Sequence, residues 1–184
     1  MLVVDFDVHH GNGTQDAFWN DPRVAYVSMH EHPLYPGSGR LDDVGGQGAR
    51  GSTVNLPFPS GTAGDAFVAG CDEVVVPFAE AFAPTWLLLS AGFDAHRRDP
   101  LAGLELSAGD YGLLTRKLAA LVAPGRRIAF LEGGYDLEAL AASAAACVGA
   151  LAGVEVAAEP PTAGSRGREV VAAALKVRHR LLDP

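Results

Sequence analysis

Lysine and cysteine are scarce in this chain, and basic residues do not outnumber acidic ones. Only Lys117 and Lys176 are lysines among 14 basic residues, and the formal net charge is −8 over 184 residues. A chain of this charge offers no basic surface to neutralise phosphates, which argues against direct binding of DNA or RNA. The scarcity of lysine, together with abundant alanine and glycine, indicates a GC-rich bacterial genome.

The sequence also lacks long hydrophobic runs and a leader segment. No run of about 18 apolar residues occurs, so we expect no membrane span. The N-terminus opens directly on a strand-like segment without a basic stretch, so we expect no signal peptide and a cytoplasmic location. The only cysteines, Cys71 and Cys147, lie in separate helix-like stretches, and we expect buried, reduced thiols.

What is present is an alternation of strand-like and helix-like segments. Pro77 should either kink the helix expected at 62–82 or start a second one. The expected strands are residues 2–8, 23–29, 54–58, 85–90 and 127–131. The strand at 127–131 is expected to be buried. The expected helices are residues 12–19, 62–82, 107–122, 137–151 and 169–182. This order predicts an α/β fold with a mainly parallel sheet and flanking helices.

The length suggests one domain or part of a larger one. Ser107 and Asp110 form a capping-box-like helix start, with Asp in place of the usual Glu. Pro160 and Pro161 mark a linker. The predicted division is a domain at 1–153, a linker at 154–168 and a peripheral C-terminal helix at 169–184.

Polar side chains follow three of the predicted strands at the point where each ends. Asp5, Asp7 and His9 end the first of these strands, Asp94 follows the fourth, and Tyr135 follows the fifth. The carboxyl ends of neighbouring parallel strands meet at one edge of a sheet, where open α/β folds bind ligands. The arrangement therefore predicts metal-dependent catalysis at that edge.

A divalent cation would satisfy these side chains together. Side chains alternate along a strand, so Asp5, Asp7 and His9 should share one face, and unpaired buried carboxylates are costly. Asp7, His9 and Asp94 would supply three ligands and leave a position open for water, the layout of a catalytic zinc site. Two carboxylates and one imidazole also suit Fe2+ or Co2+. The alternative is that Asp7 and His9 form an ordinary hydrogen-bonded pair at a capped turn.

Asp5 and Tyr135 have two interpretations each. Asp5 would orient a ligand or help to hold a monovalent cation; alternatively, it is a buried acid bound by backbone donors. Tyr135 follows Gly133 and Gly134, which allow a tight turn, and its hydroxyl would polarise a substrate carbonyl and stabilise an oxyanion. Alternatively, Tyr135 is an amphipathic packing residue.

Five motifs occur in an order typical of one family. They are residues 4–15 (VDFDVHHGNGTQ), 35–39 (YPGSG), 89–96 (LSAGFDAH), 99–101 (DPL) and 131–137 (LEGGYDL). In these motifs the chain resembles the histone deacetylase and acetylpolyamine amidohydrolase family, which are zinc amidohydrolases of the arginase-deacetylase fold. The resemblance covers residues 3 to about 152.

The resemblance implies a role for each matched residue. Asp7, His9 and Asp94 would bind Zn2+, and Tyr135 would stabilise the transition state. A structural K+ would be held by Asp5 with backbone groups of Asp7, His9, Ser28 and Met29. The substrate tunnel would be lined by Tyr35, Leu101, Gly133 and Gly134.

Leu101 bears on the choice of substrate. Polyamine-selective relatives carry an acidic residue at this position, so an apolar side chain favours an acetylated lysine or a similar acyl-lysine substrate. Hydrolysis of acetylpolyamines or other small acetylated amines is the alternative within the enzyme class. A non-catalytic metal-binding fragment is the alternative outside it.

The family's general base, a histidine pair on a loop upstream of the first motif, has no counterpart in this chain. His10 should face away from the site, and ordinary roles are expected for the remaining histidines, His30, His32, His96 and His179. The resemblance therefore implies that about the first half of the domain is absent, with its first strands and one tunnel wall. We expect weak or no activity, an uncovered strand edge and a tendency to aggregate. A gene fragment or a misassigned start would explain this.

Overall fold

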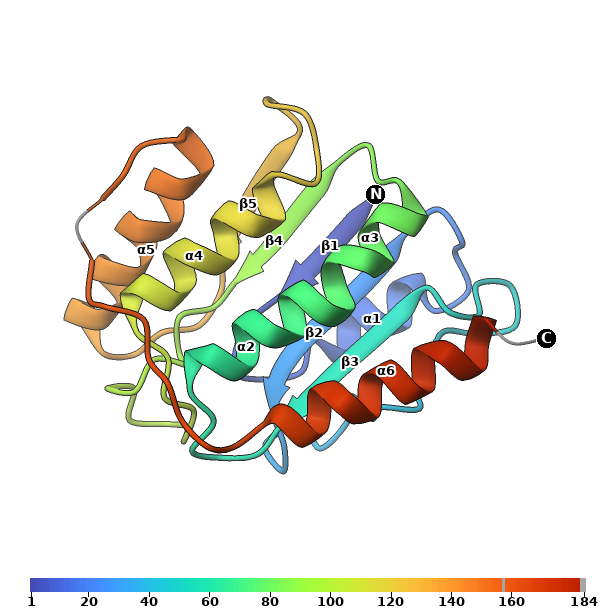
Figure 1. The fold of residues 1–184 in the computed structure, drawn as a ribbon, viewed down its shortest axis with the longest axis horizontal. Helices are drawn as coiled ribbons and strands as arrows, with labels where there is room; N and C mark the ends of the chain where they lie inside the picture. Colours follow the sequence, from blue (N-terminus) through green and yellow to red (C-terminus); the bar gives the residue numbers. More distant parts are fainter. Residues whose placement is uncertain (157, 183–184) are drawn as a thin grey trace.

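The computed structural model describes residues 1–156 and 158–182 and contains a five-stranded sheet (Figure 1). The strands are β1 (Leu2–Asp5), β2 (Ala25–Glu31), β3 (Thr53–Phe58), β4 (Leu87–Ala91) and β5 (Arg127–Leu131). Their order is β3-β2-β1-β4-β5, and every pairing is parallel. The predicted α/β fold with a mainly parallel sheet is confirmed.

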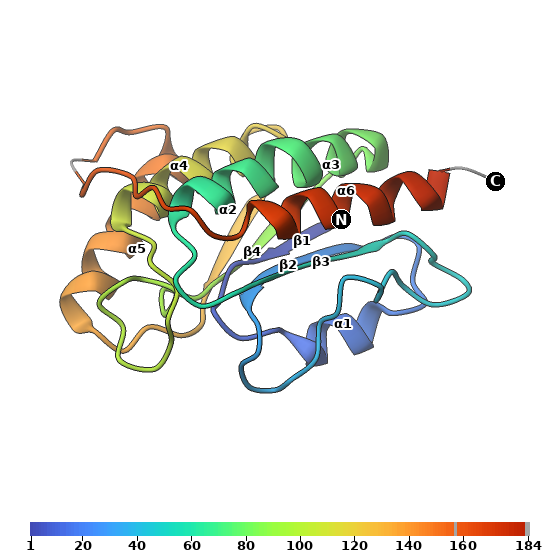
Figure 2. The same ribbon diagram turned by 60° about the horizontal axis from the view of Figure 1, so that its bottom comes forward.

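Helices cover the two faces of the sheet unequally. On one face lie α2 (Gly64–Gly70), α3 (Val76–Phe82), α4 (Ala108–Ala119) and α6 (Arg168–Leu182), whereas α1 (Asn12–Phe18) lies on the other (Figure 2). The remaining helix, α5 (Leu137–Ala152), packs against α4. None of the helices in the described residues has the length and hydrophobicity needed to cross a membrane.

Pro77 lies just after a π-helical turn. α2 ends at Gly70, the π-helical turn spans Cys71–Val75, and α3 begins at Val76 with Pro77 in its first turn. The residues at these junctions keep right-handed helical dihedral angles, so the three parts form one continuous helical segment. Proline has no amide hydrogen to donate, and π-helical turns are a common site of helix irregularity. The two outcomes expected for Pro77 were a kink and a second helix start; the observed irregularity is the π-helical turn.

Asp110 is fully buried and joins the segment after α5 to the start of α4. It completes the predicted capping box, because its carboxylate accepts a hydrogen bond from the Ser107 amide at 2.8 Å. The same carboxylate accepts hydrogen bonds from the amide and the hydroxyl of Thr162 at 3.1 and 2.8 Å. A buried carboxylate with several donors is well satisfied, so this contact anchors the segment around Thr162.

The C-terminal helix α6 packs on β3, and its residues Val171 and Ala174 are buried in the main core. The helix that the sequence placed at the periphery is therefore in contact with the sheet. The division of the chain into a domain, a linker and a terminal helix stays a prediction. Residue 157 of that linker and residues 183–184 of that helix lie outside the described residues.

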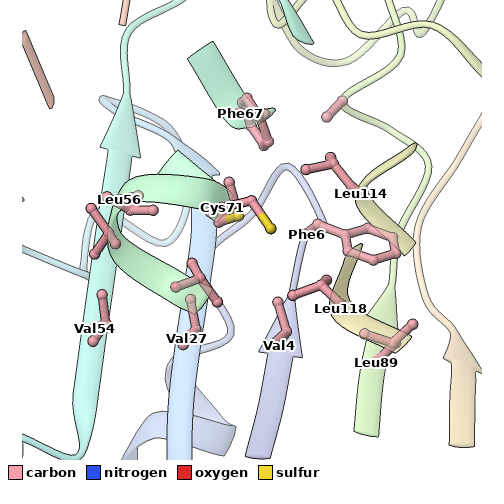
Figure 3. Packing of buried hydrophobic residues seen from close by; sticks show 14 of the residues in the cluster. Val4, Phe6, Val27, Val54, Leu56, Phe67, Cys71, Leu89, Leu114 and Leu118 are labelled. Carbon is pink, nitrogen blue, oxygen red and sulfur yellow. The ribbon is translucent and has the colours of Figure 1, made fainter. Parts of the chain in front are cut away.

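The core between the sheet and the helices fixes the strands that carry the site. Val4 of β1, Leu56 of β3 and Leu89 of β4 meet Phe67 and Leu114 from the helices (Figure 3). All four residues of the central strand β1 are buried. Burial of each large apolar side chain contributes about 1.5–3 kcal/mol. The carboxyl ends of β1 and β4 therefore emerge from a densely packed region.

The strand β5 differs from the prediction, which was a buried strand. It lies at the edge of the sheet, and the exposed fractions of Ile128, Phe130 and Leu131 are 41%, 50% and 65%. An apolar run predicts a strand but does not specify what lies beside it, and within the described residues no strand pairs with β5 except β4. The expected uncovered strand edge is therefore found at β5.

We expect Phe130→Lys to slow aggregation of the chain by at least about fivefold, because a charge on an exposed edge strand opposes pairing with another chain. Light scattering at 37 °C would measure the rate. Val154→Lys, at an exposed apolar position outside the sheet, is the matched control and should change the rate little. Equal effects of the two substitutions would show that β5 is not the aggregating surface.

Candidate metal centre

The site lies at the carboxyl ends of β1, β4 and β5. β1 ends at Asp5, so the prediction of a strand reaching Val8 with alternating site residues was wrong. The chain turns instead: the Asp7 amide donates to Asp5 Oδ1 at 3.1 Å, and the His9 amide donates to Asp7 Oδ1 at 2.8 Å. Aspartate often binds the backbone two residues ahead in this way, which competes with strand formation. The capped turn left open by the sequence is therefore present.

This turn nevertheless brings three metal-ligating side chains together. His9 Nδ1 lies 3.1 Å from Asp7 Oδ1 and 3.2 Å from Asp94 Oδ2. One ligand atom from each of the three residues lies within 4.8 Å of the other two. The three residues are those that the sequence predicted as metal ligands, and their role as ligands stays a prediction.

The Asp94 carboxylate is buried, and one of its oxygens has no hydrogen-bond partner among the described residues. It is 1% exposed, and its Oδ1 accepts a hydrogen bond from the Val8 amide at 2.8 Å. Its Oδ2 is buried without a hydrogen-bond partner. Burial, and then the charge of Asp7, raise the pKa of Asp94 to about 7. A divalent cation would supply the missing positive charge and take the free oxygen, so these residues suit a metal ion.

Two glycines allow the carboxylates to come so close. A Cβ atom at Gly92 would overlap the Asp7 carboxylate, and one at Gly133 would overlap the carboxylates of both Asp7 and Asp94. The Gly133 amide also donates to Asp7 Oδ2 at 2.9 Å. Sequence reasoning assigned Gly133 to the tunnel and did not single out Gly92, although Gly92 lies in the quoted motif that contains Asp94.

Asp5 lies deeper, and it is 3% exposed. Burial, and then the charge of Asp7, raise its pKa to about 8. Its Oδ1 accepts the Asp7 amide, and its Oδ2 accepts the Tyr26 hydroxyl at 3.2 Å. It is therefore a buried acid bound partly by the backbone, and it orients the turn that carries Asp7. Sequence reasoning missed Tyr26, which reads as an ordinary core residue of β2.

Tyr135, Asp7 and His9 line one open cavity of about 360 Å³ at this edge of the sheet. Tyr135 is 54% exposed, so its side chain is reachable from solvent. The Tyr35 ring lies edge-on to the His9 ring, with 6.4 Å between the two ring centroids. Leu101 is more than half exposed. Of the four residues predicted to line a tunnel, Tyr35 and Leu101 are exposed, whereas Gly133 and Gly134 are half-buried.

His10 lines the same cavity as Asp7 and His9, although the sequence predicted that it faces away. Its ring nitrogens are hydrogen-bonded to Ser38 Oγ at 2.8 Å and to Gln15 Oε1 at 3.1 Å, so they are not directed at the two carboxylates. Within residues 1–156 and 158–182, His9 alone among the histidines pairs with Asp7 or Asp94. The described residues thus place one imidazole, that of His9, next to the two carboxylates.

Comparison with known proteins gives related sequences. Residues 1–151 match the family described as "Histone deacetylase domain". The chain is 47% identical over 148 residues to "Histone deacetylase 10, chloroplastic" of Oryza sativa subsp. japonica, covering 79% of this chain and 33% of that protein. It is 38% identical over 193 residues to a "Probable deacetylase" of Archaeoglobus fulgidus, covering 100% of this chain and 53% of that protein. The bacterial origin and cytoplasmic location stay predictions.

Solved structures match over nearly the whole chain. The "HDA15 HD domain" gives a TM-score of 0.87 at 38% identity, covering 97% of this chain and 50% of that one. The "histone deacetylase Clr3" gives a TM-score of 0.91 at 34% identity, covering 98% of this chain and 31% of that one. The chain thus spans from about a third to about half of the length of these relatives.

We expect Gly133→Ala to weaken Zn2+ or Co2+ binding by about 10- to 100-fold, because the new methyl group would push apart the two carboxylates. Isothermal titration calorimetry would measure the affinity. Gly13→Ala is the matched control, since a Cβ there meets no atom within 4 Å. Native-like metal affinity in Gly133→Ala would contradict the placement of the cation between Asp7 and Asp94.

Proposed function

This chain belongs to the histone deacetylase family, and we propose that its site is the metal centre of a zinc-dependent hydrolase of N-acetyl amides. The observation that carries the proposal is the buried Asp94 Oδ2, which lacks a hydrogen-bond partner and lies 3.2 Å from His9 Nδ1. Together with Asp7, these groups offer two negative charges and one neutral ligand to a cation. The family match supports deacetylation as the chemistry.

Each residue would have a separate task. Asp7, His9 and Asp94 would hold Zn2+, with Fe2+ or Co2+ as alternatives for a ligand set with two carboxylates. The bound cation would polarise the acetyl carbonyl and make water nucleophilic at neutral pH. Tyr135 would donate its phenolic hydrogen to the carbonyl oxygen as negative charge develops there. Its half-exposed position on the cavity suits contact with a substrate arriving from solvent.

We also propose that Asp5, Ser28 and Met29 hold a structural K+. His30 Nε2 lies 3.1 Å from the Gly39 carbonyl, which can only accept, so the ring hydrogen belongs on Nε2. His30 Nδ1 then accepts the hydrogen of the Ser28 hydroxyl at 2.8 Å. The Ser28 side chain is thus engaged with His30, and K+ would be held by Asp5 and by backbone groups of Asp7, His9, Ser28 and Met29.

For the substrate, we propose an acetylated lysine or a similar acyl-lysine group. The support is the apolar side chain of Leu101 together with the aromatic ring of Tyr35 beside His9. A methylene chain would lie against such groups, whereas a cationic polyamine would gain no ion pair from Leu101. Small acetylated amines, including acetylpolyamines, are the second candidate substrate, and a non-catalytic metal-binding fragment is the candidate of a different class.

The same residues imply impaired turnover. Breaking an amide requires a proton for the leaving amine, and a positioned acid or base typically contributes about 10²- to 10⁴-fold. No second histidine of the described residues pairs with Asp7 or Asp94 to serve this purpose. The exposed apolar side chains of β5 also favour aggregation. We therefore propose that the chain alone is weakly active or inactive.

We expect a fluorescent hydroxamate, which chelates metals through two oxygens, to bind the chain only when Zn2+ is supplied. Asp94→Asn should weaken this binding at least about 100-fold, because it removes a charged ligand. Asp42→Asn, a change of the same chemistry at an exposed position, should leave it unchanged. Fluorescence polarisation with and without a chelator would measure the affinities. Equal binding in the chelator, or by Asp94→Asn, would refute the metal centre.

Turnover of an acetyl-lysine fluorogenic peptide by the Zn2+-loaded chain should be about 10²- to 10⁴-fold below that of a full-length relative, because the positioned proton carrier is missing. Initial rates of both proteins in the same assay would test this. Equal rates would contradict the proposed impairment. Faster release of acetate from an acetylated polyamine than from the peptide would favour the second substrate.

A further inference from the structure

The turn that carries Tyr135 is fixed through its backbone. The Gly133 amide donates to Asp7 Oδ2 at 2.9 Å, and the Gly133 carbonyl accepts from the Phe93 amide at 2.8 Å. The next residue, Gly134, has a φ of 134°, a conformation that residues with a Cβ rarely adopt. Gly134 is therefore the residue at which the chain turns between the fixed Gly133 and Tyr135.

Asp99 binds the backbone that follows Gly134, at the amide of Tyr135. It is 8% exposed, and its Oδ2 accepts the Tyr135 amide at 2.8 Å while its Oδ1 accepts the Leu101 amide at 2.9 Å. Its own amide donates to the His96 carbonyl at 2.8 Å, within the loop that begins at Asp94. One carboxylate thus connects the turn of Tyr135 to the loop of a candidate metal ligand.

Few other contacts restrain the phenol. The Tyr135 side chain is 54% exposed, so core packing does not determine its position. Arg98 forms an ion pair with Asp136 at 3.2 Å, but the Arg98 side chain is 44% exposed, and ion pairs of that exposure contribute little. The part-buried hydrogen bond from the Tyr135 amide to Asp99 restrains the chain next to Gly134. On the other side of Tyr135, Asp136 is held as the N-cap of α5, where its Oδ1 accepts from the Ala139 amide at 2.8 Å.

We propose that Asp99 is a positioning residue that sets where the Tyr135 hydroxyl lies relative to the metal ligands and to Leu101. This role rests on the proposed function of Tyr135 as a hydrogen-bond donor to the carbonyl. Without the Asp99 carboxylate, Gly134 can rotate and the phenol samples positions too far from the carbonyl oxygen. A displacement of about 1 Å at such a group costs about 10²-fold in rate.

The test uses the full chain with Co2+, whose absorption spectrum reports the ligands, and a fluorescent hydroxamate, whose carbonyl would accept a hydrogen bond from Tyr135 under the proposed function. Asp99→Ala should keep the Co2+ spectrum and keep the Co2+ affinity within about threefold, because it removes no ligand. It should weaken hydroxamate binding at least about tenfold. Asp99→Asn, which retains one acceptor oxygen, should recover part of that loss. Asp42→Ala, at an exposed aspartate, is the control.

A double-mutant cycle separates positioning from general stability. In a Tyr135→Phe background, Asp99→Ala should cause less than about a third of the loss it causes in the native background, because the hydroxyl that it positions is gone. Additive losses, or a lost Co2+ spectrum in Asp99→Ala, would overturn the positioning role while leaving the metal centre intact in the native chain. Failure of the native chain to bind the hydroxamate with metal would overturn the proposed function and this role with it.

Discussion

Three parallel strands end side by side, and this places the carboxylates of Asp7 and Asp94 around the single imidazole of His9. The two carboxylates repel each other, and Asp94 is buried with one oxygen that has no hydrogen-bond partner among the described residues. Leaving such a group without a counter-charge costs free energy. The proposed cation site would resolve this, because a divalent ion would be coordinated by both carboxylates. The remaining features of the edge follow from this requirement: the glycines that make room, the Asp5 carboxylate that orients the turn, and the phenol at the opening.

The strand that leads to Asp7 is buried, whereas the strand that leads to Tyr135 is exposed. β1 lies at the centre and is buried along its whole length, so the Asp7 turn starts from a rigid base. β5 is the outermost strand, with exposed Phe130 and Leu131, and it leads into the turn of Tyr135. The ligand half of the site is therefore better supported than the half that would contact the substrate. The contact from Asp99 to the Tyr135 amide offsets part of that difference.

Much of the fold could be predicted from local sequence patterns. The strands follow from short apolar runs, and the helices follow from apolar residues at helical spacing. The start of α4 follows from Ser107 and Asp110, and the irregularity before α3 coincides with Pro77. Each of these depends on residues close together in the chain. The exposure of β5 could not be predicted in this way, because burial depends on neighbours that an apolar run does not specify.

The candidate site was predictable where strand ends carry ionisable residues. Asp7, His9 and Asp94 are such residues, and the structure brings them together. The predicted strand at residues 2–8 was too long, because Asp5 and Asp7 accept hydrogen bonds from backbone amides two residues ahead and the strand ends at Asp5. Tyr26 was missed because a tyrosine in a strand is usually a core residue, and Asp99 was quoted in a motif but given no role. Only their contacts with Asp5 and with the Tyr135 amide reveal what they do.

The most direct measurement is anomalous diffraction at the zinc edge from crystals of the chain grown with Zn2+. The account predicts a peak bonded to Asp7, His9 and Asp94 at about 2.0–2.2 Å from one atom of each. A crystal that contains Zn2+ elsewhere but shows no peak between these residues, with the Asp94 oxygen turned away from His9, would contradict it.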